Sequence, residues 1–191
     1  SGIGAVCHTI NPRLSSDQLT YIINHAEDLL LFVDLTFVPI LEAVKEKLPP
    51  EIKIIILTDK KNMPKTSLKT MCYEELLKDK PQKINWPDFN ENTAASLCYT
   101  SGTTGEPKGT LYSHRSTVLH AMMIAISLPD ALKEGKKILP VVPLFHVNAW
   151  GLPYAAPLTG AGIVFPGPKL DGDSLFNLME AEKVYSAWGV P

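Results

Sequence analysis

The sequence has few cysteines, no block of like charge and no leader pattern. Cys7, Cys72 and Cys98 lie far apart and form no CxxC pair, so neither a disulfide framework nor a zinc site is expected. Reduced thiols indicate a cytoplasmic protein. The 18 basic and 20 acidic residues are spread along the chain and give a net charge of -2, so a nucleic-acid partner is not expected. No basic and apolar signal-peptide pattern opens the chain.

Several short catalytic and binding motifs are also missing. There is no GxxxxGK[ST] of a Walker A loop, no GxGxxG and no GxSxG. His114 and His120 are six residues apart, and His8 and His25 fall on separate predicted elements, so the histidines lack metal-ligand spacing. These absences exclude the usual nucleotide loops, the serine-hydrolase elbow and a histidine zinc site.

Charged side chains are absent from residues 138–168. By length alone this stretch would suit a transmembrane helix. Proline and glycine interrupt it too often for one helix to cross a bilayer, which favours a buried strand, a helix and a second strand. The interrupting residues are Pro140, Pro143, Gly151, Pro153, Pro157, Gly160 and Gly162.

The rest of the chain alternates short β-branched runs with segments of helical period, and 45% of its residues are hydrophobic. Ser15, Ser16 and Asp17 offer a cap for the first helix, and Asp171 and Asp173 for the last. Predicted strands are 4–10, 30–34, 52–58, 94–100, 110–114, 138–143, 161–166 and 185–191. Predicted helices are 19–29, 37–48, 73–78, 115–128 and 173–184, and in the fourth of them Val118, Met122 and Ile126 recur at a spacing of four.

Strands separated by helices predict an α/β fold, a doubly wound and mostly parallel sheet with helices on both faces. The pattern weakens over about 60–92, which is polar and contains proline, and we expect a weak internal seam there. Ligands of such folds bind at the carboxyl ends of strands, and a glycine- and threonine-rich loop follows the predicted strand 94–100.

That loop lies within YTSGTTGEPKGT, residues 99–110. Two flanking strands argue against a linker and for a hairpin-like turn, in which Gly102, Gly105 and Gly109 would supply positive φ angles. Yet its hydroxyls exceed what a turn requires. Hydroxyl groups and unhindered backbone N–H groups can donate to anionic oxygens, and Lys108 adds a cation, so a phosphate cradle is the second interpretation.

The stretch LCYTSGTTGEPKG, residues 97–109, resembles the signature of the adenylate-forming, AMP-binding superfamily, which includes acyl-CoA synthetases, luciferases and peptide-synthetase adenylation domains. NPRLSSDQLTYIINHAE (11–27) resembles the acyl-CoA synthetase branch. VVPLFHVNAWGLPYAAPLTGA (141–161) and FPGPKLD (165–171) are similar to fatty acid-CoA ligases, especially medium-chain ones. The likeness runs from about Gly4 to Pro191 and is least specific near the polar seam.

This resemblance implies an enzyme that joins a carboxylic acid to the α-phosphorus of ATP, releases pyrophosphate and passes the acyl group to coenzyme A. Lys108 and His146 are then the implied catalytic residues, with His146 also beside the acyl chain. Asn148 and Trp150 are the other implied acyl-pocket residues, and Thr100 is implied to lie near Mg²⁺. The implied phosphate-binding residues are Thr100, Ser101, Gly102, Thr103, Thr104, Gly105 and Lys108.

Without the resemblance, His146 would be interpreted as a satisfied core histidine and Trp150 as core. The resemblance further implies that residues 1–191 are part of an AMP-binding N-terminal domain, without the C-terminal small domain, and that the isolated chain makes neither adenylate nor thioester. The complete protein is expected to be cytoplasmic and a homodimer. The alternatives are a non-catalytic nucleotide-binding module and an adenylation domain that delivers to a carrier protein.

Overall fold

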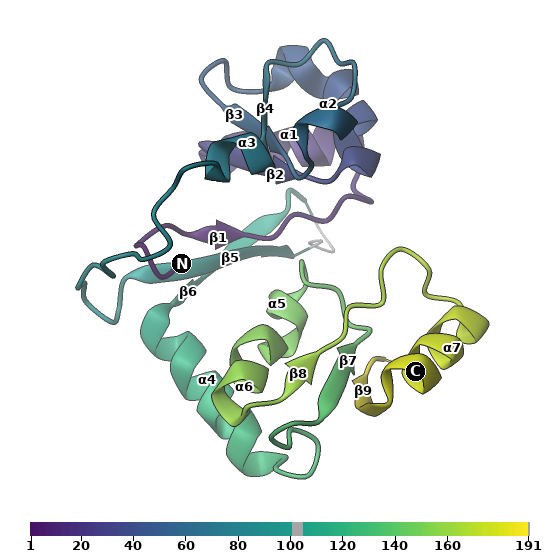
Figure 1. Cartoon of the computed structure of the whole chain (residues 1–191). Helices are drawn as coiled ribbons and strands as arrows, with labels where there is room; N and C mark the ends of the chain where they lie inside the picture. The colour runs from purple at the N-terminus through teal and green to yellow at the C-terminus, as the bar shows by residue number, and fades with distance from the viewer. Residues whose placement is uncertain (101–104, 191) are drawn as a thin grey trace. The chain divides into compact units, whose positions relative to one another are not determined.

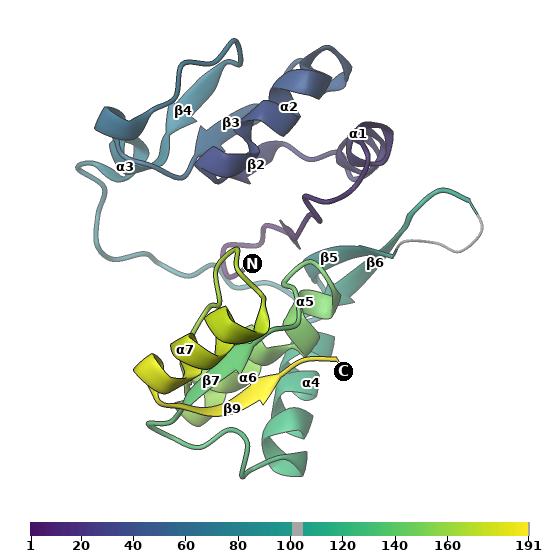
Figure 2. The same cartoon turned by 90° about the vertical axis from the view of Figure 1, so that its right-hand side faces the viewer.

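The computed structural model describes residues 1–100 and 105–190. The chain forms two compact units, and the path crosses between them more than once (Figures 1 and 2). Of the described residues, the first unit contains 1–10, 86–100 and 109–190, and the second contains 11–85 and 105–108. The boundary falls after Lys108, the first residue of a strand that otherwise belongs to the first unit. Nine described strands form three sheets of three strands each, in the orders β1-β5-β6, β2-β3-β4 and β8-β7-β9.

The second unit is built on the sheet β2-β3-β4, whose neighbouring strands are parallel. Its strands are β2 (Leu30–Val33), β3 (Lys53–Ile56) and β4 (Thr70–Cys72). Its α-helices are α1 (Ser16–His25), α2 (Val38–Val44) and α3 (Tyr73–Leu77). Its 3-10 turns are η1 (Leu35–Phe37), η2 (Lys45–Lys47) and η3 (Lys60–Asn62).

The predicted cap of the first helix is confirmed, and apolar side chains form the core of this unit. Ser15 caps α1, and Gln18 completes a capping box with it. Leu31 and Val33 of β2 are buried while Leu30 and Phe32 are about half exposed, as expected for a sheet with one covered face. Buried side chains of α1, α2 and β3 complete the core of the unit: Leu19, Ile22, Ile23, Val38, Leu41, Val44, Ile54, Ile55 and Ile56.

Two elements of this unit differ from the expectation. The predicted helix 37–48 is divided into η1, α2 and η2, with Pro39 in the first turn of α2 and Pro49 after the last turn. Strand β4 was not predicted, because Thr70–Cys72 is only three residues long and lies in the polar stretch. Its pairing with the buried strand β3, rather than its own pattern, makes it a strand.

A carboxylate on α2 holds the segment before β4. Oε1 of Glu42 accepts hydrogen bonds from Oγ1 of Thr66 at 2.6 Å and from the backbone N–H of Ser67 at 3.0 Å. The bond from Thr66, followed by that from Ser67, lowers the pKa of Glu42. The folded state therefore favours the ionised side chain.

We expect Glu42→Gln to lower the thermal stability at neutral pH. A folded-state pKa below the unfolded value of about 4.3 means that the carboxylate stabilises the fold above that pH. The contribution is lost as pH falls through the folded-state pKa, so the Tm difference between wild type and variant should close in acid. Thermal unfolding across pH measures it, with the exposed Glu51→Gln as control. A Tm difference that does not change with pH would contradict the prediction.

The first unit contains the other two sheets. Its strands are β1 (Cys7–His8), β5 (Ala94–Thr100), β6 (Lys108–Ser113), β7 (Lys137–Pro140), β8 (Gly162–Ile163) and β9 (Val184–Trp188). Its helices are α4 (His114–Ser127), α5 (Val147–Trp150), α6 (Leu152–Thr159) and α7 (Gly172–Glu182). Strand β1 is parallel to β5, and β7 is parallel to both β8 and β9. The α/β class with parallel sheets is thus confirmed, with the strands divided among three sheets.

The uncharged stretch 138–168 folds as expected, into β7, α5 and α6, and β8. Ile138 and Leu152 are fully buried in a core that also receives Ala121 of α4. Burying each of the two large side chains contributes about 1.5–3 kcal/mol. Over residues 1–100 and 105–190, no helix has the length and apolar character needed to cross a membrane.

Helix α4 is present where predicted, but its repeating apolar residues do not face this core. Val118, Met122 and Ile126 are 50%, 44% and 72% exposed, whereas Ala121 is buried and Ile124 packs against the core. The side-chain spacing predicted the helix but not which face would be covered. At the other end of the unit, Asp171 caps α7 as predicted.

Candidate functional site

The strand that leads into the glycine- and threonine-rich loop is β5, and Thr100 is its last residue. Ser101, Gly102, Thr103 and Thr104 lie outside the described residues. Gly105 has a φ of 114°, as the turn interpretation requires, and the loop ends at Lys108, the exposed first residue of β6. Strands β5 and β6 are neighbours in one sheet, which confirms strands on both sides of the loop (Figures 1 and 2).

Gly109 serves a different purpose from the one expected. It is not among the glycines with positive φ, so its predicted role in turning the chain is wrong. A Cβ atom there would lie 3.1 Å from Cδ1 of Leu97 and 3.2 Å from Cζ of Tyr99. The glycine therefore lets β6 pass close to the Tyr99 ring. The His8 ring also lies near the Tyr99 ring, with 5.2 Å between centroids.

His146 stands at the start of an unusual turn in the first unit. It is exposed, and its backbone N–H donates to the carbonyl of Pro143 at 3.1 Å. The next four residues, Val147–Trp150, form α5 with φ angles of 49°, 48°, 49° and 55°. The chain then passes through Gly151, with a φ of 75°. Four successive non-glycine residues in the left-handed region are rare, and such strain is concentrated at functional sites.

The turn contains a buried polar side chain. Asn148 is 7% exposed, and its Oδ1 accepts from Oγ1 of Thr9 at 3.1 Å and from Sγ of Cys98 at 3.1 Å. Thr9 follows β1, and Cys98 lies in β5, two residues before Thr100. The turn that follows His146 is thereby bonded to β5 and to the residue directly after β1. The predicted place of Asn148 in an acyl pocket stays a prediction.

Trp150, the last residue of the turn, contacts the hydrophobic core and α4. Its ring is half-buried and packs against the core around Leu152, and its backbone oxygen lies 3.2 Å from Nε2 of His120 on α4. A Cβ atom on Gly151 would come within 2.6 Å of Cδ2 of His120, so glycine is required for the approach of α4 as well as for its φ. The structure thus brings His146, Asn148 and Trp150 together in one turn.

Three residues with contacts to this turn were not predicted: Thr9, Cys98 and His120. Thr9 and Asn148 are 139 positions apart, so no local pattern links them. Thr9 lies inside the predicted strand 4–10, and nothing in that stretch marks it as a partner of Asn148. His120 was considered only for metal-ligand spacing, and the helix period gives no sign of its contact with Trp150.

Burial also changes the acidity of two tyrosines in the first unit. Burial raises the pKa of Tyr112, and the nearby Cys98 thiol adds to the effect. Burial likewise raises the pKa of Tyr154 on α6, with a further contribution from Cys7. Both phenols therefore keep their protons at neutral pH and offer hydroxyl groups rather than charges.

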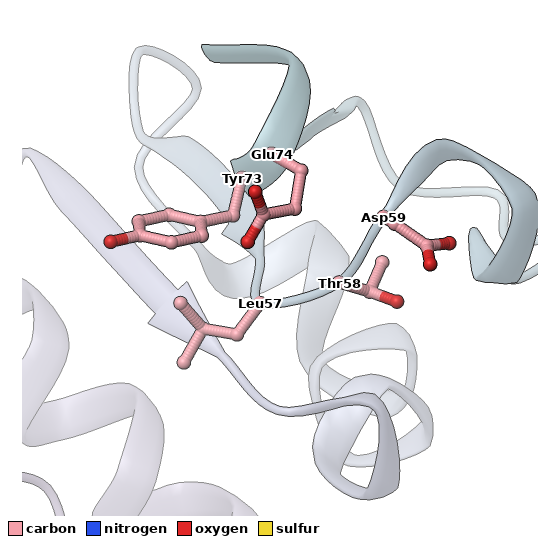
Figure 3. A pocket seen from close by; sticks show the side chains of 5 residues that line it. All are labelled: Leu57, Thr58, Asp59, Tyr73 and Glu74. Atoms are coloured by element: carbon pink, nitrogen blue, oxygen red, sulfur yellow. The ribbon is translucent and has the colours of Figure 1, made fainter. Parts of the chain in front are cut away.

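The second unit has an open hollow at the carboxyl ends of β3 and β4, with a volume of about 560 Å³ (Figure 3). Leu57 and Tyr73 both line it, and the carboxylate of Asp59 is directed away from Tyr73. Asp59 already accepts hydrogen bonds from the backbone and side chain of Asn62. Glu74 adds a second acidic group, and none of the lining residues is basic, so this hollow does not suit a triphosphate.

No metal site of several ligands is present in the part of the chain that the structure describes. Within it, no group of three or more His, Cys, Asp or Glu side chains is placed to hold a metal ion. Thr100 offers one hydroxyl oxygen. Mg²⁺ in nucleotide sites is held by the substrate phosphates and a few protein oxygens, so Thr100 fits as one contact but not as a site of its own.

The chain is similar to curated CoA ligases over its whole length. It is 52% identical over 195 residues to the medium-chain-fatty-acid-CoA ligase of Ectopseudomonas oleovorans, covering 100% of this chain and 35% of that protein. It is 49% identical over 201 residues to the 3-methylmercaptopropionyl-CoA ligase of Ruegeria lacuscaerulensis, covering 100% and 36%. The chain therefore spans about a third of the length of these relatives.

The fold also has a counterpart among solved structures. The N-terminal domain of FACL13 from Mycobacterium tuberculosis superposes with a TM-score of 0.78 at 22% identity, covering 98% of this chain and 44% of that one. At that identity the likeness concerns the fold. The profile of the AMP-binding enzyme family matches residues 1–191 in full. With a match of that extent and relatives near 50% identity, the chain belongs to the AMP-binding enzyme family.

Proposed function

We propose that the protein containing this chain is an ATP-dependent fatty acid-CoA ligase. The observation that carries the proposal is the whole-chain similarity to named CoA ligases within the AMP-binding family. In the first step a carboxylate oxygen attacks the α-phosphorus of ATP, and the bond to pyrophosphate breaks. In the second step the sulfur of coenzyme A attacks the acyl carbonyl carbon, and AMP leaves.

Both reactants of the first step are anions, so they repel each other and must be aligned for attack. The protein must therefore supply groups that neutralise charge and that position the reactants. Residues Thr100 to Gly105 and Lys108 are proposed to hold the β- and γ-phosphates through hydroxyl groups, backbone N–H groups and one ammonium group. Thr100 is proposed to contact the Mg²⁺ that accompanies ATP, which would neutralise phosphate charge. The cytoplasmic location and the homodimer stay predictions.

His146 is proposed to lie beside the acyl chain and the adenylate phosphate, with Asn148 and Trp150 as walls of the acyl pocket. Its exposure and its place on a strained turn support this assignment over a satisfied core histidine. The names of the two relatives suggest an acid of short to medium length with an apolar chain. That substrate class belongs to the proposal.

The proposal predicts acid-dependent exchange of pyrophosphate into ATP by the complete protein. Straight-chain carboxylic acids of graded length should support exchange, with the highest kcat/KM among medium lengths, and addition of coenzyme A should yield the thioester. Thioester formation on a carrier protein but not on coenzyme A would favour the adenylation-domain alternative. Nucleotide binding by thermal shift without exchange with any acid would favour the non-catalytic module and contradict the proposal.

A further inference from the structure

The left-handed turn 147–150 has a strained backbone, and the hydrogen bonds within the turn do not offset that strain. Val147, Asn148, Ala149 and Trp150 all have φ near 50°, and a β-branched residue such as Val147 is strongly disfavoured there. The turn's own hydrogen bonds are short-range ones, from Ala149 N–H to the His146 carbonyl and from Gly151 N–H to the carbonyls of Val147 and Asn148. Such a turn persists only where contacts outside it hold it in place.

Besides the contacts of Trp150 with His120 and the core, two outside hydrogen bonds meet at one side chain of the turn. Oδ1 of Asn148 accepts from both Thr9 and Cys98, and the Thr9 hydroxyl lies 3.6 Å from the Cys98 sulfur. The three groups form one cluster, in which Asn148 and Cys98 are buried and Thr9 is partly buried. Asparagine is also among the residues that best tolerate left-handed backbone. A hydrogen bond in this buried setting is worth more than one at the surface, and an unmade one costs more.

We infer that Asn148 is a positioning residue: its buried amide oxygen, bonded to Thr9 and Cys98, fixes the left-handed turn and thereby the placement of His146 and Trp150 for the acid substrate. This inference rests on the proposed function. Asn148 precedes Trp150 by two residues and follows His146 by two, so any rotation of the turn moves both. Cys98 lies two residues before Thr100, so the same cluster links the turn to the strand that leads into the phosphate loop.

Thr9 gives the sharpest test, because it can be changed without altering any residue of the turn. Thr9→Val removes the hydroxyl donor at similar volume, and Thr9→Ser keeps it. In the complete protein, acid-dependent pyrophosphate exchange should show kcat/KM for the acid about fivefold lower in Thr9→Val, the effect of one neutral hydrogen bond. KM for ATP should stay within about twofold, and Thr9→Ser should restore the acid parameters.

Asn148→Ala should lower kcat/KM for the acid further, by about tenfold or more, because both bonds are lost. If Asn148 had a purely structural role, the variants would lower Tm, while kcat/KM for the acid and KM for ATP would change together or not at all. That result in Thr9→Val would overturn the inference, even if Asn148→Ala did not fold. Absence of exchange in wild type with every acid would overturn the proposed function, and this inference with it. Exchange in wild type with unchanged acid kinetics in both variants would overturn the inference alone.

Discussion

Lys108→Ala is expected to lower kcat/KM for ATP by about 5- to 150-fold in the complete protein, which corresponds to about 1–3 kcal/mol. The ammonium group sits at the exposed start of β6, directly after the loop, and is proposed to contact the phosphates. Charge-assisted hydrogen bonds to phosphate are stronger than neutral ones, and the cation also offsets the negative charge that the carboxylate must approach. Pyrophosphate exchange at varied ATP measures the effect.

Two further variants test whether the effect of Lys108→Ala depends on the position of the lysine and on the shape of its cationic group. Lys136→Ala removes an exposed lysine outside the loop and should leave the exchange kinetics unchanged, because net charge alone is screened in salt. Lys108→Arg keeps the charge but replaces a compact ammonium group with a planar fork, and should recover only part of the loss. Unaltered kinetics for ATP in Lys108→Ala would refute the assignment of Lys108 to the phosphates.

Gly151→Ala is expected to destabilise the protein by about 2–3 kcal/mol. About 1–2 kcal/mol arises from placing an L side chain at a φ of 75°. The new Cβ would also meet the His120 ring at 2.6 Å, so the ring must move and its contact with the Trp150 carbonyl is lost, at about 1 kcal/mol. Denaturant unfolding with constant m-value measures the change.

Gly135→Ala separates the two causes. Gly135 has a similar φ of 70°, but a Cβ there meets nothing within 4 Å, so its substitution reports the backbone cost alone. Gly151→Ala should exceed it by the His120 contribution, and the excess should vanish when both variants are made in a His120→Ala background. Equal losses at the two glycines would show that the approach of His120 contributes nothing.

Local signals in the sequence were enough for most of the fold. Ser15, Ser16 and Asp17 marked the start of α1, and Asp171 and Asp173 marked the start of α7. Prolines and glycines within 138–168 correctly excluded a single long helix. Strand β4 could not be predicted because its three residues become a strand only by pairing with β3. The exposed face of α4 was not predictable either, since spacing at Val118, Met122 and Ile126 shows a helical period without showing what covers it.

For the candidate site, sequence resemblance pointed to residues 146, 148 and 150, and the structure brings them into one turn. It could not indicate the hand of that turn, because no glycine occupies positions 147–150 and the usual marker of positive φ is absent. The contacts of Asn148 with Thr9 and Cys98 depend on tertiary packing across the first unit.

The hand of α5 also limits how this segment can change during evolution. In stereochemical terms its four residues have the backbone of the mirror-image helix, which D-amino acids prefer and the genetic code does not supply. Among encoded residues only glycine relieves the strain fully, and it does so by deleting the side chain. At positions 147–150, a gain in backbone stability from glycine therefore comes at the loss of a side chain. Every other residue there must be held by its surroundings against its own conformational preference.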